Sequence, residues 1–132
     1  MAIRRIGVLT SGGDAPGMNP CVRAVVRSAL YHGLEVYGIR RGWHGLIQGD
    51  VVKLDEKSVT RIINKGGTIL YTARSKEFMT EEGQRKAASV CKFLGLDSII
   101  AIGGDGTFRG AQALSKFGVN VIGIPATIDN DI

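Results

Sequence analysis

The sequence is poor in aromatic residues and has no long apolar run. Only 6% of its residues are Phe, Trp or Tyr. No basic run interleaves with them, which argues against a nucleic-acid surface despite a formal net charge of +5. No stretch reaches the roughly 18 consecutive apolar residues of a transmembrane helix. The first apolar run begins close to Met1 and leaves no room for a signal peptide. We therefore expect a cytoplasmic protein with no nucleic-acid or membrane partner.

Cysteine is also scarce, whereas glycine is abundant. Cys21 and Cys91 both fall in expected helices, which predicts reduced packing residues rather than a disulfide. The 19 glycines show no collagen-like period and indicate many tight strand-to-helix turns. At 132 residues the chain forms one domain at most. Its positive charge favours a phosphorylated small molecule, because guanidinium groups bind phosphate in pairs.

Apolar runs alternate with segments of helical spacing along the chain. This order predicts an α/β fold, a Rossmann-like parallel sheet with helices on both faces. Residues 40–49 are expected to form a loop. The expected strands or extended pieces are residues 5–10, 34–39, 51–54, 68–72, 98–102 and 119–124, and the expected helices are residues 20–32, 58–64, 81–94 and 108–117.

A glycine-rich turn at residues 103–107 follows a buried strand and begins a helix. Glycines at a strand-to-helix turn let the backbone come close to an anion, at which the helix N–H groups then point. Asp105 stands among them and would repel a phosphate unless a divalent cation lies between the two. An alternative is that Asp105 only caps the helix. We interpret the turn as a metal–phosphate site.

Three polar loops follow three of the predicted strands, at residues 11–19, 103–107 and 127–131. The carboxyl ends of parallel strands share one edge, so these loops should meet in one crevice. In extended backbone Asp129 and Asp131 would face the same side. Adjacent carboxylates can raise one pKa and provide a base near neutral pH. The alternative is an ordinary solvated turn.

The residues alone do not decide the role of three other features. Arg23 and Arg27 share one helix face, as a phosphate clamp or as a solvated stripe. Arg74 follows a short extended run and could contact phosphate or only solvent. Trp43 could pack in the core or stack on a base.

The motifs together resemble the N-terminal part of the bacterial 6-phosphofructokinases. The resemblance covers the whole chain, and the combination of its first and last motifs is specific. The GGDGT turn alone is less so, because NAD kinases and diacylglycerol kinases also have it. The matching motifs are residues 6–19, 66–68, 73–74, 103–107 and 125–131.

This resemblance implies a glycolytic phosphotransferase that moves the γ-phosphoryl group of ATP to the 1-hydroxyl of fructose 6-phosphate. Asp129 would be the base, and Asp105 would bind Mg²⁺. By the same resemblance, Gly13, Trp43, Arg74, Ser75, Gly104, Asp105, Gly106 and Thr107 would bind ATP, and Thr127, Ile128, Asp129 and Asp131 would bind the sugar substrate. Pyrophosphate-using relatives commonly have Asp at position 106 and Lys at position 126, whereas Gly106 and Ala126 leave room for ATP.

The resemblance also implies regulation and assembly. Arg23 and Arg27 match arginines that hold the phosphates of ADP or phosphoenolpyruvate between subunits of a homotetramer. Glu56, Lys57 and Arg61 replace an Arg, an aromatic residue and an Asp of that effector site, so we expect weak or altered regulation.

The family chains are more than twice as long. We therefore interpret residues 1–132 as an incomplete N-terminal ATP-binding domain without the sugar-phosphate-binding remainder, and expect it to be inactive alone. The alternative is a non-catalytic ATP-binding fragment or regulatory module.

Overall fold

The computed structural model describes residues 3–11, 18–60, 70 and 76–125. A five-stranded sheet forms its centre, with strand order β3-β2-β1-β4-β5. Strands β2, β1, β4 and β5 pair in parallel. The strands are β1 (Arg5–Thr10), β2 (Glu35–Ile39), β3 (Val51–Leu54), β4 (Ser98–Gly103) and β5 (Val121–Pro125).

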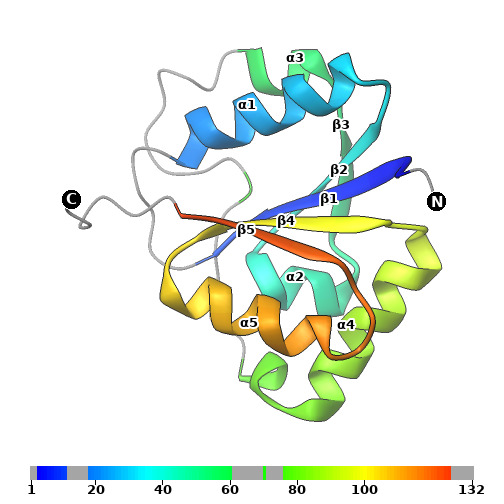
Figure 1. Ribbon diagram of the computed structural model, residues 1–132, viewed down its shortest axis with the longest axis vertical. Helices are drawn as coiled ribbons and strands as arrows, with labels where there is room; N and C mark the ends of the chain where they lie inside the picture. The colour runs from blue at the N-terminus through cyan, green and yellow to red at the C-terminus, as the bar shows by residue number, and fades with distance from the viewer. Residues whose placement is uncertain (1–2, 12–17, 61–69, 71–75, 126–132) are drawn as a thin grey trace.

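Helices cover both faces of this sheet, as predicted. One face carries α1 (Met18–Tyr31) and α3 (Glu56–Thr60), and the other carries α2, α4 and α5 (Figure 1). No helix in the described ranges is both long and apolar enough to cross a membrane. The helices of the second face are α2 (Gly42–Gln48), α4 (Glu81–Leu94) and α5 (Asp105–Ser115), and a short 3-10 helix, Glu77–Met79, precedes α4.

Strand β3 departs from the expected parallel arrangement, because it pairs antiparallel to β2. Only residues 40–50 connect the two strands, and a parallel crossover needs about a dozen residues or more. The amide of Arg40 instead donates to the carbonyl of Asp50 at 2.9 Å, which turns the chain directly back beside β2. The expected loop over residues 40–49 is also wrong, because helix α2 lies within it.

The central strand β1 is buried from both sides. Ile6 and Val8 pack with Val22 and Val26 under α1. Leu9 points the other way into a second cluster with residues of α2, α4 and α5. Alternate residues of a strand face opposite sides, so an apolar run at this position needs helices on both faces.

Helix α4 begins and ends where the sequence predicts. The hydroxyl of Thr80 accepts a hydrogen bond from the amide of Gly83 at 3.0 Å, as an N-cap does. Gly95 has φ 71°, a left-handed conformation that favours glycine at the end of a helix.

Both cysteines are free, as predicted. Burial raises the pKa of the Cys91 thiol to about 11, and burial also raises the pKa of Cys21. A thiol with a raised pKa is a poor nucleophile at neutral pH, which fits a packing role.

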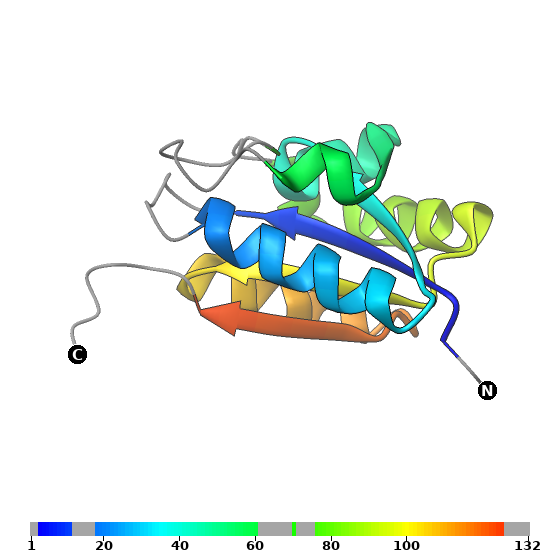
Figure 2. The ribbon, with the colours of Figure 1, turned by 90° about the horizontal axis from the view of Figure 1, so that it is seen from above.

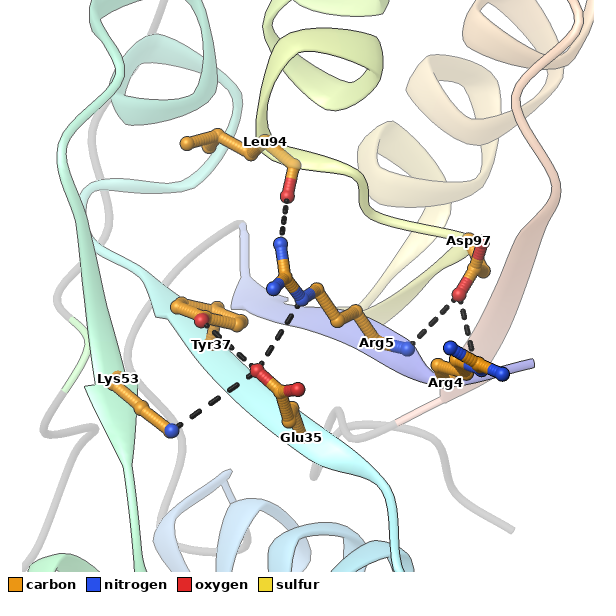
Figure 3. Close-up of polar contacts among 7 residues, drawn as sticks. All are labelled: Arg4, Arg5, Glu35, Tyr37, Lys53, Leu94 and Asp97. Atoms are coloured by element: carbon orange, nitrogen blue, oxygen red, sulfur yellow. Dashed lines mark hydrogen bonds and ion pairs between the residues drawn. The ribbon is translucent and has the colours of Figure 1, made fainter.

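The amino ends of the strands are joined by a polar network around Arg5 (Figure 3). Nε of Arg5 lies 3.2 Å from Glu35 on β2, and its Nη1 donates to the carbonyl of Leu94 at 3.0 Å. The backbone amides of Arg4 and Arg5 donate to Oδ2 of Asp97 at 2.8 and 2.9 Å. Strands β1 and β2 and the segment that enters β4 are thereby tied together at the edge opposite the glycine-rich turn.

Asp97→Asn is expected to lower the melting temperature at pH 7. The amides of Arg5 and then Arg4 hold the pKa of the Asp97 carboxyl below its usual range. The folded pKa is thus below the unfolded one, so the stabilisation is present above about pH 3.9 and is lost as the pH falls through the folded pKa. Thermal melts of both proteins from pH 7 to pH 2 should converge at the acid end, and a gap that does not depend on pH would contradict this.

Candidate functional site

The glycine-rich turn lies where β4 ends and α5 begins. Gly103 is the last residue of β4, and Gly104 is the N-cap of α5 with φ −108° and ψ −152°. No side chain caps this helix. The amide of Thr107 donates to the carbonyl of Gly104 at 3.0 Å. The amides before it have no acceptor within the helix, so the turn presents hydrogen-bond donors and the positive end of the helix dipole.

The three glycines of the turn differ in what surrounds them. A Cβ on Gly103 would collide with the carbonyl oxygen of Ser11 and with Oγ1 of Thr107. A Cβ on Gly104 or Gly106 would have no atom within 4 Å among the described residues. Neither of these two has a positive φ. The fold therefore needs the first glycine, whereas no described atom fills the space above the other two.

Thr107 lies beneath the turn. Its side chain is fully buried, and its Oγ1 has no hydrogen-bond partner among the described residues. An unsatisfied buried hydroxyl is unfavourable and is uncommon in a folded protein. Together with the open space at Gly104 and Gly106, this hydroxyl fits a turn that binds a phosphate group and its cation. The side chain of Asp105, the predicted Mg²⁺ ligand, lies outside the described residues.

The ends of the three strands that lead into the predicted loops lie side by side at this edge of the sheet. The amide of Ser11, just after β1, donates to the carbonyl of Ile102 at 2.9 Å. Pro125 at the end of β5 pairs in register with Gly103. Figure 2 shows β1 and β5 pointing to the same edge, at which α5 begins. The bodies of the first and third loops lie outside the described residues.

Trp43 lies in the core, on helix α2. Only 6% of its surface is exposed, and its ring stacks on Phe78 with centroids 4.7 Å apart and planes 4° apart. A Cβ on Gly110 of α5 would lie 2.5 Å from Nε1 of Trp43. Sequence reasoning missed Gly110, although an isolated glycine within a helical pattern signals such close packing. A contact between Trp43 and adenine stays a prediction.

The predicted effector arginines both lie on α1. Nε of Arg27 is 3.8 Å from Oε2 of Glu56 on α3. Nε of Arg23 is buried and has no partner among the described residues. The Glu56 carboxylate therefore lies beside Arg27, one of the two arginines predicted to bind an effector phosphate.

The remaining predicted site residues lie outside the part of the chain that the structure describes. Their roles stay predictions. They are Gly13, Arg74, Ser75, Thr127, Ile128, Asp129 and Asp131.

The chain matches the family model described as Phosphofructokinase over residues 5–132. It is 58% identical over 98% of its length to an ATP-dependent 6-phosphofructokinase of Clostridium botulinum, and 59% identical over the same share to that of Shouchella clausii. It spans 41% of the length of these curated relatives.

Solved structures show the same architecture. The phosphofructokinase of Pichia pastoris in the T-state superposes with a TM-score of 0.92 and 35% identity, over 98% of this chain and 16% of that one. A pyrophosphate-dependent phosphofructokinase of Nitrosospira multiformis superposes with a TM-score of 0.85 over 99% of this chain and 35% of that one, and at 18% identity shows the fold alone. With a family match over nearly its whole length, the chain belongs to the phosphofructokinase family.

Proposed function

We propose that the chain is the nucleotide-binding part of an ATP-dependent 6-phosphofructokinase. The main support is Gly106 in the first turn of α5. A helix with glycine at an interior position is less stable than the same helix with alanine, by up to about 1 kcal/mol. Within the described part of the chain, neither a positive φ nor a neighbouring atom requires glycine there. A ligand that needs the space above the backbone accounts for this residue.

In this proposal the amides of the turn bind the ATP phosphates, and the buried hydroxyl of Thr107 supports the loop beneath them. Mg²⁺, when bound through Asp105, neutralises charge on the phosphates. Gly13, Arg74 and Ser75 would complete the phosphate site. Phosphoryl transfer depends mostly on positioning and charge neutralisation, which such a turn supplies.

The reacting hydroxyl would meet the loop after β5. The Asp129 carboxylate would take the proton from the 1-hydroxyl of fructose 6-phosphate, while that oxygen bonds to the γ-phosphorus and the bond to the bridging oxygen of ADP breaks. Thr127, Ile128 and Asp131 would hold the sugar beside it. The register of Pro125 with Gly103 supports this, because it starts the loop next to the phosphate turn.

The proposed donor is ATP rather than pyrophosphate. Gly106 is exposed and adds no negative charge beside the phosphates. The similar relatives from Clostridium botulinum and Shouchella clausii are both named as ATP-dependent enzymes.

The chain is expected to bind MgATP more tightly than ATP without Mg²⁺, and more tightly than Mg-pyrophosphate. Isothermal titration of the three ligands into the 132-residue chain measures this order. Turnover of fructose 6-phosphate by the same chain is expected to be absent, because the sugar-phosphate-binding remainder is not part of it. Equal affinity for ATP with and without Mg²⁺, or tighter binding of Mg-pyrophosphate, would contradict the proposal.

Regulation is proposed to be weak in the whole enzyme. The Glu56 carboxylate lies 3.8 Å from Arg27 and would compete with an effector phosphate for the guanidinium group. The velocity response to ADP and phosphoenolpyruvate should therefore be nearly flat. Glu56→Gln should increase that response, because the amide has no negative charge. Strong inhibition of the unaltered enzyme by phosphoenolpyruvate would refute this proposal.

A further inference from the structure

The corner between β2 and α2 has a strained backbone. Arg41 has φ 64° and ψ 33°. Among the described residues, no other residue except glycine has a positive φ. Gly42 follows with φ 58°. A side chain is disfavoured in this left-handed region, so the conformation persists only where neighbouring contacts hold it.

Asp50 and Leu70 supply those contacts. Oδ1 of Asp50 accepts from Nε of Arg40 at 3.2 Å, and its Oδ2 lies 3.6 Å from Nη1 of Arg41. The Asp50 carbonyl also accepts from the amide of Arg40 at 2.9 Å. The amide of Arg41 donates at 2.8 Å to the carbonyl of Leu70, a fully buried residue. We call Arg40, Arg41 and Asp50 the corner brace.

The braced corner packs against the end of β1. A Cβ on Gly42 would lie 2.9 Å from the Thr10 carbonyl oxygen and 3.7 Å from Cβ of Ser11. The Ser11 carbonyl oxygen in turn lies against the backbone of Gly103. A continuous series of packed backbone groups thus runs from the corner brace to the glycine-rich turn.

We propose that Asp50 is a positioning residue for the MgATP site, because it fixes the left-handed corner that supports the end of β1 against the turn at Gly103. Asp50 touches neither the nucleotide nor the reacting atoms. The proposal rests on the proposed function of the turn. The separate ion pairs are partly exposed and individually weak, so their effect depends on fixing one backbone conformation.

The chain offers a matched control and a local probe. Asp50 and Asp55 lie on either side of β3. Asp55 accepts from the amide and hydroxyl of Ser58, each at 2.9 Å, at the start of α3 and away from the corner. Trp43, the single tryptophan, comes two residues after Arg41 and reports the state of the corner by its fluorescence.

The test compares Asp50→Asn, Arg41→Gly and Asp55→Asn with the unaltered chain, each verified as folded by far-ultraviolet circular dichroism. Arg41→Gly accepts the same φ and so cannot unfold through strain. We expect Asp50→Asn to weaken MgATP binding about fivefold, the equivalent of one modest interaction. Arg41→Gly should act in the same direction, because it loses the ion pair to Asp50 and glycine also adopts conformations outside the left-handed region. Both should shift Trp43 emission to longer wavelength and increase its quenching by acrylamide. Asp55→Asn should change neither readout.

MgATP affinity within about twofold of the unaltered chain for both corner variants would overturn the proposal, as would equal weakening by Asp55→Asn. If the unaltered chain does not bind MgATP, the proposed function fails. Trp43 emission of the ligand-free variants then decides whether the corner brace exists, because it does not depend on the nucleotide.

Discussion

Asp129→Ser, in the complete enzyme, is expected to lower kcat by about 10²- to 10⁴-fold, the usual contribution of a general base. Serine cannot hold the proton of the sugar hydroxyl at neutral pH. The KM values for MgATP and fructose 6-phosphate should change little, because Asp129 is proposed to act in the transition state rather than in binding. Steady-state kinetics with both substrates varied measure the two effects separately.

Asp97→Asn is the control for this experiment. Asp97 lies at the amino-end edge of the sheet and ties β1 to the start of β4 through backbone amides. Its replacement should lower stability and leave kcat unchanged. A kcat for Asp129→Ser close to that of the unaltered enzyme would remove Asp129 from the proposed mechanism.

Gly103→Ala and Gly106→Ala are expected to have opposite effects on stability. A methyl group at 103 would collide with Ser11 and Thr107 in a closely packed strand end, so unfolding should become easier by about 3 kcal/mol. A methyl group at 106 has open space and improves helix propensity, so the melting temperature should be equal or higher.

MgATP binding should nevertheless weaken in the Gly106→Ala protein. Close packing of a methyl group against a phosphate is unfavourable by about 1–3 kcal/mol, which corresponds to roughly 5- to 150-fold in affinity. Thermal melts measure the melting temperature, and titration calorimetry on the same preparations measures the affinity for MgATP. A Gly106→Ala protein that binds MgATP as well as the unaltered chain would show that the space above the turn is not used by the nucleotide.

The elements with strong local signals could be predicted from the sequence. Strand β1 contains the apolar segment 6–9 and lies at the expected residues. Helix α4 has acidic residues in its first turn, and its Thr80 cap and terminal glycine act as predicted. These features depend on neighbours in the chain, which a sequence displays directly.

Helix α2 and the direction of β3 could not be predicted, because both depend on contacts across the fold. Three glycines in residues 42–49 weaken the helical pattern. One of them, Gly45, packs so closely on the Arg40 carbonyl that a side chain there would collide. The return of the chain beside β2 depends on Asp50, whose partners Arg40 and Arg41 are not apparent from spacing.

At the candidate site, the sequence indicated a glycine-rich phosphate turn, and the resemblance assigned Gly104 and Gly106, but not Gly103, to ATP. The structure adds that packing requires Gly103, whereas no described atom excludes a side chain at Gly104 or Gly106. The sequence did not decide whether Trp43 packs in the core or stacks on a base. Its stacking on Phe78 depends on helix packing that no sequence pattern reveals.

The proposed function requires that the turn at residues 103–107 holds the phosphates of MgATP. Nitrogen-15 NMR of the 132-residue chain during a titration with MgATP tests it most directly. We expect the amides of Gly104, Asp105, Gly106 and Thr107 to shift most, while those of Arg4, Arg5 and Asp97 at the opposite edge stay unchanged. Saturable binding that leaves the turn amides unmoved, or that shifts the opposite edge instead, would contradict it.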